Sequence, residues 1–343
     1  MTDVLFCGYF GFENLGDETL LGALAGETLR RCPSLSLAAL SGPSPGYWKD
    51  FVEPVPRGTA ATALRSTRLL CVGPGGIFQD ATSSLSCAWY AAKVWRARRQ
   101  GVPVVHVGQS VGPLKTRIAR GLTRWALSAG RAVAVRDDRS LRLGEELAPR
   151  VPITRCADAA WLVPSPPPGG ERDPRLVSLA PRPWQRAGTT AEWWARVARA
   201  LAELGCGVLW VAFSPDDLRL VREAKRLSGV AAEAVGPCTR PEEAVAAFGS
   251  CGGLLAMRLH ALILGAVAGV SPAGVSYDPK IDGLLDRLGE TALCPAASPS
   301  DPPDAAERVA RSLGRAPDSA AVERERELAR RNVDVILQAL GEP

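Results

Sequence analysis

Residues 102–135 read VPVVHVGQSVGPLKTRIARGLTRWALSAGRAVAV. The β-branched run from Val102 to Val107 predicts a buried strand that ends at Gly108. Lys115 to Ser128 has the apolar spacing of a helix, and Ala132 to Val135 predicts the next strand. A strand, a glycine turn, a helix and a second strand form the unit that repeats in parallel sheets with helices on both faces.

The same alternation continues on both sides of one proline-rich segment. Leu69 to Val72 predicts an earlier strand, and Leu176 to Leu179 and Val208 to Phe213 predict later ones. Between the two halves, Pro164 to Gly170 is rich in proline and glycine and can continue neither a strand nor a helix. We therefore expect a semi-rigid linker between two similar halves.

This organisation predicts an α/β protein with two Rossmann-like domains that face a cleft. Ligands of such sheets bind beyond the carboxyl ends of the strands. The expected segments are an N-terminal domain at residues 1–164, a linker at 165–174, a C-terminal domain at 175–318 and a C-terminal helix at 319–343.

The composition favours a globular protein of a reducing compartment. The chain has 343 residues, of which 46% are hydrophobic, so it can bury a sizeable core. Its nine cysteines are scattered and form no C-x-x-C pair, which is typical of buried thiols and gives no metal site. The N-terminus resembles a first strand, and the longest apolar run, Ala261 to Val270, is too short to span a membrane. We expect a cytoplasmic protein.

The positive charge has two interpretations. The net charge is +5, and all but five of the 41 basic residues are arginine, which an arginine-rich composition or anionic ligands would explain. The predicted helix at Lys115 to Arg124 is basic and is followed by Trp125, so it could rest on an anionic membrane surface or simply be solvated. No motif for nucleic-acid binding is present.

Three glycine-containing turns follow predicted strands. The first, Gly8 to Glu18, is neither a dinucleotide-binding motif nor a P-loop. Its Asn14 and Asp17 have the spacing of a helix N-cap with an acidic partner. Equally, Asp17 or Glu18 could lie at the cleft, where a carboxylate would hold acceptor hydroxyls or take a proton from one.

The second and third turns have the same place relative to their strands. Gly75 and Gly76 would let the backbone approach a ligand closely, and Gln79 and Asp80 offer polar recognition. Gln109 has the corresponding position in the third turn. Each of these segments alone could be a simple tight turn. Three polar turns at three strand ends favour a ligand-binding site at the carboxyl edge of the sheet.

The chain has two histidines, His106 and His260. His106 lies inside an apolar strand and is interpreted as a core residue. If residues 258–260 are extended, Arg258 and His260 point to the same side, so a fixed cation lies beside a group that titrates near neutral pH. Such a pair could bind an anionic substrate and move a proton. On a helix they would lie about 200° apart, and a capping role would explain them.

Two further arginines follow predicted strands. Arg182 comes after Leu176 to Leu179 and is a second candidate for binding an anion. Arg136 comes after Ala132 to Val135, although a surface ion pair with Asp137 would explain it equally well.

Taken together and in this order, these motifs resemble the polysaccharide pyruvyl transferase family, in particular its cell-wall branch linked to S-layer anchoring. The resemblance covers most of the chain, although Pro74 and Ser110 stand where the family usually has glycine. The segments that carry it are Gly8 to Gly11, Asn14 to Glu18, Gly75 to Asp80, Gly108 to Pro113, Val135 to Asp137, Met257 to His260 and Ser276 to Lys280.

The resemblance implies a glycosyltransferase-B-like fold and a transferase that uses phosphoenolpyruvate as co-substrate, without another cofactor or a metal. The enolpyruvyl group would form a pyruvate ketal on a lipid-linked or polymeric cell-wall saccharide, typically on N-acetylmannosamine. We expect donor binding in the C-terminal domain and acceptor binding in the N-terminal domain. Independently of the resemblance, the basic helix could give peripheral contact at the inner membrane face.

In that chemistry His260 is the expected general acid, Arg258 and Arg182 bind the donor's anionic groups, and Asp17 takes up a hydroxyl proton. The other expected substrate-binding residues are Asn14, Glu18, Gly75, Gly76, Gln79, Asp80, Gln109, Arg136, Tyr277, Asp278 and Lys280.

Two alternatives to pyruvyl transfer stay open. A nucleotide-sugar glycosyltransferase of the same fold would use the arginine and histidine on a diphosphate leaving group. A non-catalytic protein that binds the membrane surface would depend on the helix from Lys115 to Arg124 instead.

Overall fold

The computed structural model describes residues 1–342, except 82–84, 168–169 and 185–187. It divides into two compact units. Unit 1 comprises Met1–Leu162 and Glu325–Pro343, and unit 2 comprises Val163–Arg324. The predicted linker at 165–174 includes 168–169, which lie outside the described residues, and its last two residues begin a strand.

Unit 1 is an α/β unit whose strands all pair in parallel. Its strands are β1 (Thr2–Phe12), β2 (Leu37–Ser44), β3 (Glu53–Pro56), β4 (Thr67–Val72), β5 (Gly75–Phe78), β6 (Val104–Val111), β7 (Ala132–Val135) and β8 (Ile153–Arg155). Its helices are α1 (Leu15–Arg31), η1 (Tyr47–Asp50), η2 (Arg57–Thr59), α2 (Ala60–Leu64), α3 (Ser86–Arg99), α4 (Arg117–Ser128), α5 (Asp138–Leu147), η3 (Ala159–Leu162) and most of α12 (Ser319–Leu340).

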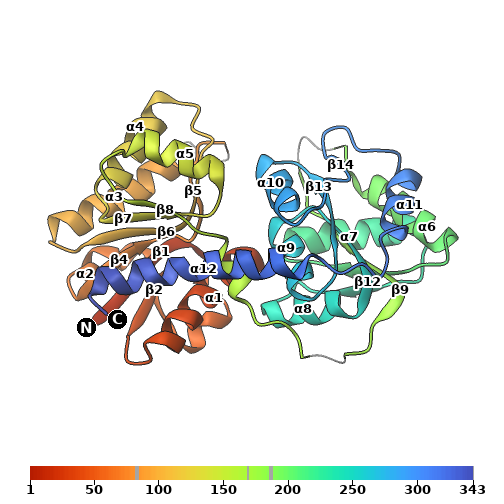
Figure 1. Cartoon of the computed structure of the whole chain (residues 1–343), viewed down its shortest axis with the longest axis horizontal. Coiled ribbons are helices and arrows are strands. Elements are labelled where there is room, and N and C mark those ends of the chain that lie inside the picture. Colours follow the sequence, from red (N-terminus) through yellow and green to blue (C-terminus); the bar gives the residue numbers. More distant parts are fainter. Residues whose placement is uncertain (82–84, 168–169, 185–187, 343) are drawn as a thin grey trace. The chain divides into compact units, whose positions relative to one another are not determined.

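The sheet of unit 1 has the order β3-β2-β1-β4-β6-β7-β8, with β5 paired to β6 (Figure 1). The chain therefore moves from β1 to one side and later to the other, which leaves a topological switch point between β1 and β4. Right-handed crossovers place α3, α4 and α5 on one face of this sheet and α1 on the opposite face. Tyr90, Val94, Ala126, Leu127 and Leu147 bury the inner sides of α3, α4 and α5 in one core.

Unit 2 repeats the plan. Its strands are β9 (Asp173–Ala180), β10 (Gly207–Val211), β11 (Glu233–Val235), β12 (Cys251–Ala256), β13 (Pro272–Ser276) and β14 (Cys294–Pro295). Its helices are α6 (Ala191–Glu203), α7 (Pro215–Ser228), α8 (Pro241–Gly249), α9 (Leu259–Val267), α10 (Pro279–Arg287) and α11 (Pro302–Ala310). The parallel order β11-β10-β9-β12-β13-β14 puts the switch point between β9 and β12.

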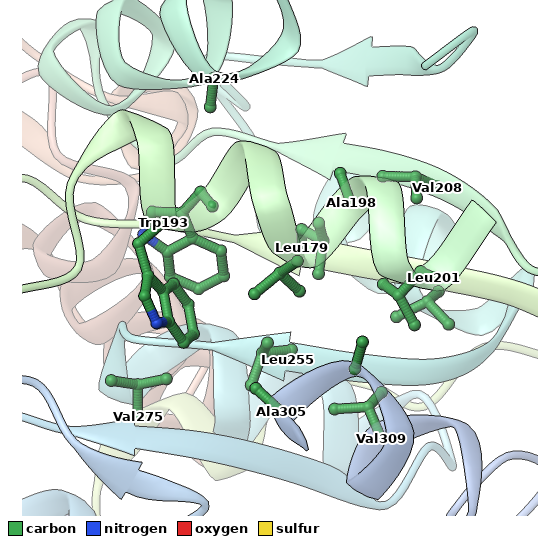
Figure 2. Close-up of a cluster of buried hydrophobic side chains, with 14 of the residues drawn as sticks. Leu179, Trp193, Ala198, Leu201, Val208, Ala224, Leu255, Val275, Ala305 and Val309 are labelled. Carbon is green, nitrogen blue, oxygen red and sulfur yellow. The ribbon is translucent and has the colours of Figure 1, made fainter. Parts of the chain in front are cut away.

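The core of unit 2 lies between this sheet and its helices (Figure 2). Trp193 and Leu201 on α6 pack against Leu179 of β9 and Leu255 of β12, and Val309 of α11 completes the layer. Strand β12 is buried along its whole length and β9 is buried from Val177 to Ala180, because helices cover both faces of a parallel sheet. This core therefore holds β9 and β12 in place, the two strands whose carboxyl ends flank the switch point.

The α/β class and the Rossmann-like form of each half, predicted from the alternation, are confirmed. One local prediction is wrong: the segments expected as glycine turns continue the strands. β1 extends through Gly8 to Phe12, and β6 extends through Gly108 to Val111, where Gln109 pairs with both Gly75 and Val135. Glycine is needed for close packing there, since a Cβ on Gly8 would lie 2.3 Å from the Phe10 ring.

Among the helices in the described residues, none is long and apolar enough to cross a membrane. Each of the nine cysteines is a free thiol, and all but Cys32 are buried.

The C-terminal helix α12 is tied to unit 1 by one buried asparagine. The Asn332 side chain accepts a hydrogen bond from Gly108 N at 2.8 Å and donates to Ala157 O at 3.0 Å. Gly108 has a φ of +56°, and Asn332 is fully buried. A helix that follows unit 2 in sequence is thereby held against β6, where the pairing of β6 with β7 is irregular between His106 and Gln109.

We predict that Asn332→Ala lowers the free energy of unfolding by about 1–3 kcal/mol, because it leaves a buried N–H and a buried carbonyl without partners. Urea denaturation measures this loss. Gln338→Ala, an exposed position on the same helix, is the control and should change stability by less than about 0.5 kcal/mol. Equal effects of the two substitutions would contradict the assignment.

His106 is a core residue, as expected. Its side chain is fully buried, its Nε2 lies 3.0 Å from Ala126 O, and burial lowers the pKa of the imidazole to about 4. The unfolded state therefore binds a proton at a higher pH than the folded state does. This linkage stabilises the fold above a pH of about 6.5 and is lost as the pH falls toward 4.

We predict that His106→Gln removes a contribution on the order of 3 kcal/mol from the pH dependence of stability between those two pH values. Thermal melts of wild type and variant across this range measure the difference. Parallel curves for the two proteins would show that the imidazole is not the group responsible.

Candidate functional site

The carboxyl edge of the unit 2 sheet gathers most of the predicted C-terminal site residues. Ala180 of β9 pairs with Ala256 of β12, and Arg182 and Arg258 each follow two residues later. Adjacent parallel strands lie about 4.8 Å apart, so the switch point is flanked by two arginines. The open edge of this sheet is where Rossmann-like folds bind ligands.

Arg258 is held in one orientation by a buried carboxylate. Its Nε and Nη2 donate to the two oxygens of Asp217 at 2.5 and 2.6 Å, and Nη2 also donates to Ser214 Oγ at 3.0 Å. Asp217 is fully buried and also accepts from Phe213 N at 3.1 Å. This fork geometry fixes the guanidinium plane and offsets its charge.

Arg182 has a different environment, made of aromatic rings. Its Nη1 donates to Tyr277 Oη, and its guanidinium lies 4.8 Å from the Tyr277 ring centroid and 5.4 Å from that of Trp184. Lys280 Nζ lies 5.4 Å from the Tyr277 ring. Within the described part of the chain, Arg182 forms no ion pair with a carboxylate. We call Arg182, Trp184, Tyr277 and Lys280 the Arg182 cluster.

Asp278 lies next to this cluster and stabilises the start of a helix. It is the N-cap of α10, where its side chain accepts from Lys280 N at 3.1 Å. Its carboxylate also lies 3.8 Å from Lys280 Nζ, and both side chains are about one-third exposed, so this ion pair is weak. Asp278 thus orients the start of α10 and leaves Arg182 and Lys280 as the main positive charge.

His260 lies in the first turn of α9, and Arg258 is the N-cap of the same helix. Arg258 has an extended backbone, with φ −90° and ψ 130°, but His260 is helical. The expectation that residues 258–260 form one extended segment is therefore wrong, because α9 begins immediately after the arginine. Both residues still lie at the carboxyl edge beyond β12.

In unit 1, the acidic residues after β1 have separate surroundings. Asn14 is the N-cap of α1, as expected, but its side chain bonds the carboxylate of Asp17 and not a backbone N–H. Glu18 accepts from Gly11 N at 2.8 Å, from Phe12 N at 3.3 Å and from Trp48 Nε1. Burial raises the pKa of the Glu18 carboxyl. Glu18 therefore holds the end of β1, whereas half-buried Asp17 lies nearer the surface.

A second arginine site lies where β5, β6 and β7 end. Arg136 donates through Nε to Ser110 Oγ at 2.7 Å and through Nη1 to Asp158 at 2.6 Å, and both members of this ion pair are buried. The proposed surface pair of Arg136 with Asp137 is wrong, since Asp137 caps α5 and accepts from Ser110 Oγ. Exposed Gly76 lies next to this buried guanidinium, since a Cβ at Gly76 would lie 3.8 Å from Arg136 Nη2.

The remaining predicted residues of unit 1 shape this edge. Gln109 is fully buried and donates to Val72 O at 2.7 Å, which joins β6 to β4. Gly75 is buried at the start of β5, and Gln79 accepts from Ala81 N at 2.7 Å. Asp80 accepts from Lys115 N and Thr116 N at 2.8 Å, and these hydrogen bonds keep the pKa of its carboxyl low.

Arg57 was not predicted from the sequence, yet it occupies the same edge. Its guanidinium lies 4.4 Å from the Trp89 ring centroid and 4.7 Å from that of Phe12, and Nη2 donates to Gly8 O at 2.5 Å. Lys93 Nζ lies 4.3 Å from the same Trp89 ring. Among the described residues, neither cation pairs with a carboxylate. Half-exposed Tyr9 stacks on Phe12 beside them.

Sequence reasoning also missed Ser214 and Asp217. A signal was present, because Ser-Pro-Asp-Asp at residues 214–217 follows a predicted strand and is typical of a helix N-cap with an acidic first turn. No such signal marks Arg57 and Trp89, which meet only because η2 and α3 both begin at the carboxyl edge.

Chemically, the edge of unit 2 can bind a small dianion and move a proton. Arg182 and Lys280 supply positive charge, Arg258 supplies an oriented guanidinium, and His260 is the titratable group. The edge of unit 1 instead combines a carboxylate, aromatic rings and cations, which suits a larger polar ligand.

Solved structures with this fold are GT-B glycosyltransferases and related proteins. Arabidopsis thaliana UGT89C1 complexed with UDP is 12% identical, with a TM-score of 0.66 over 99% of this chain and 100% of that one. S. aureus MnaA with UDP is 8% identical, with a TM-score of 0.64 over 100% and 99%. Anabaena HepE with UDP-glucose is 12% identical, with a TM-score of 0.56 over 99% and 98%. At such identities the likeness establishes the GT-B-like fold alone.

The sequence defines the family within this class. The family model for polysaccharide pyruvyl transferase matches residues 30–279. The chain therefore belongs to the polysaccharide pyruvyl transferase family, and it is a transferase. The matched range includes Arg182, Arg258 and His260. Comparison with curated protein sequences found no match.

The Arg258–Asp217 pair is expected to be strongly coupled. In a double-mutant cycle of Asp217→Asn and Arg258→Gln, we predict a coupling energy on the order of 3 kcal/mol, because either single change leaves a buried charge uncompensated. Denaturant unfolding of the four proteins provides the measurement.

The matched control is Asp216→Asn with Arg219→Gln, an exposed pair on the same helix α7. Its coupling should stay below about 0.5 kcal/mol. If the buried pair couples no more strongly than this exposed pair, Asp217 does not hold Arg258.

Proposed function

We propose that this protein transfers the enolpyruvyl group of phosphoenolpyruvate to two hydroxyls of a cell-wall saccharide and forms a pyruvate ketal. The observation that carries the proposal is the Arg182 cluster beside the oriented Arg258, because Arg182 itself pairs with no carboxylate among the described residues and Lys280 pairs only weakly with Asp278. The acceptor we propose is a lipid-linked saccharide with N-acetylmannosamine, as in the S-layer anchoring branch of the family.

The reaction balances without an oxidant or reductant. The methylene carbon of phosphoenolpyruvate gains a proton and becomes a methyl group, while the central carbon forms bonds to two sugar oxygens and loses its bond to the phosphate oxygen. The two hydroxyls lose two protons. One of them balances the proton that is added to the methylene carbon, and the other ends on the released phosphate.

The donor would be bound by unit 2. Phosphoenolpyruvate carries a carboxylate and a phosphate, and guanidinium groups bind such anions through paired hydrogen bonds. We assign Arg182 and Lys280 to charge neutralisation and Arg258 to orientation, because Asp217 already offsets the charge of Arg258. His260 would deliver the proton to the methylene carbon as general acid.

The acceptor would be bound by unit 1. Asp17 is our proposed base for a sugar hydroxyl, with Asn14 as its hydrogen-bonding partner. Gly76 and Arg136 would contact the saccharide, while Glu18, Gln109 and Asp80 would act by holding the backbone of this edge. The rings of Tyr9 and Trp89, with Arg57 and Lys93, extend the proposed acceptor surface.

The test is phosphate release from phosphoenolpyruvate with a synthetic lipid-diphosphate disaccharide that ends in N-acetylmannosamine. We predict that His260→Ala lowers kcat by about a hundredfold or more, because it removes the general acid. Arg182→Gln should lower kcat/KM for phosphoenolpyruvate by about a hundredfold, because it removes a charge-assisted contact.

Two matched controls separate local from general damage. His106→Gln replaces the buried histidine, and Arg175→Gln replaces the arginine near the opposite end of β9; both should retain activity within about twofold. Activity that survives His260→Ala would remove that residue from its role but keep the reaction. Binding of a UDP-sugar without binding of phosphoenolpyruvate would overturn the proposal in favour of a glycosyltransferase.

A further inference from the structure

The segment from Ala81 to Arg136 carries positive charges and no negative ones. It contains ten lysine and arginine residues and no aspartate or glutamate. Because the whole chain has a net charge of only +5, the remainder is net negative and the positive charge is concentrated in this one segment. The segment includes α3 and α4, which lie on the same face of the unit 1 sheet.

Helix α4 presents its outer side as a mixed apolar and basic face. Arg117, Ile118, Gly121, Arg124 and Trp125 are all exposed, and their spacing places them on one side of the helix. Ile118 is 76% exposed and Trp125 is 41% exposed, which is unusual for side chains of this size. The opposite side is buried through Ala119, Thr123 and Ala126.

Helix α3 continues the same kind of surface. Leu85, at its N-cap, is 73% exposed, and Trp95 is 48% exposed with the Arg99 guanidinium 5.1 Å from its ring. The two helices pack against each other, with Thr123 Oγ1 bonded to Cys87 Sγ at 3.6 Å. Since both bury their inner sides in one core, their outer sides face the same direction (Figure 1). Four large apolar side chains thus lie among basic ones on this α3–α4 face.

We propose that the α3–α4 face docks on a bilayer of anionic phospholipid. Tryptophan, leucine and isoleucine would enter the interface between headgroups and acyl chains, and the arginines and lysines would remain at the phosphate level. Charge complementarity selects this partner. The segment has no carboxylate, so a negatively charged surface attracts its basic side chains and repels none of its residues. Docking goes beyond the proposed pyruvyl transfer, since it needs no catalysis.

Co-sedimentation with vesicles tests this proposal. The full chain should bind vesicles of phosphatidylcholine with about one-third phosphatidylglycerol far better than pure phosphatidylcholine, and added salt should weaken the binding. Arg117→Gln with Arg124→Gln should reduce binding roughly thirty-fold, at about fivefold for each charge near the surface. Ile118→Ser with Trp125→Ser should also release the protein, while phosphate release with a water-soluble acceptor is retained.

The matched control is Arg222→Gln with Arg226→Gln, which removes two exposed charges from α7 in unit 2 and should leave vesicle binding unchanged. Equal binding to neutral and anionic vesicles would overturn the proposal. The same conclusion would follow if the α4 and α7 charge variants lost binding to the same extent, because the effect would then depend on net charge and not on the α3–α4 face.

Discussion

Each unit depends on one topological constraint: its first strand lies inside the sheet, and later strands are added on both sides of it. In unit 2 the strands next to this point are β9 and β12, and in unit 1 they are β1 and β4. Helices that leave adjacent strands in opposite directions cannot cover the carboxyl edge between them. The candidate site residues therefore collect at these two edges, although they are far apart in the sequence.

Charge compensation distinguishes the arginines at these edges. Arg258 and Arg136 each pair with a buried aspartate, Asp217 and Asp158, so their positions are fixed and their charge is largely offset. Arg182 and Arg57 lie against aromatic rings instead, without a carboxylate partner among the described residues. In the proposed function, Arg258 would orient the donor, and Arg182 would attract its anionic groups.

A similar division applies to the surface of unit 1. Its sheet edge offers carboxylate, amide and aromatic groups, whereas the α3–α4 face combines exposed apolar side chains with basic ones. Helix α3 contributes to both surfaces, because Trp89 near its start contacts Arg57 while Trp95, almost two turns later, is exposed. If the proposed acceptor is lipid-linked, one unit can meet both the saccharide and the membrane that carries its lipid.

The sequence alone determined the α/β class, the two Rossmann-like halves and the family, because hydrophobic alternation and ordered motifs are local patterns. It also placed Arg182, Arg258 and His260 after strands. Only the tertiary structure decided that the glycine-containing segments extend strands, that Asn332 joins the last helix to unit 1, and that Asp217 holds Arg258. These contacts join residues distant in the chain, and the pairing of a buried charge depends on what folding brings beside it.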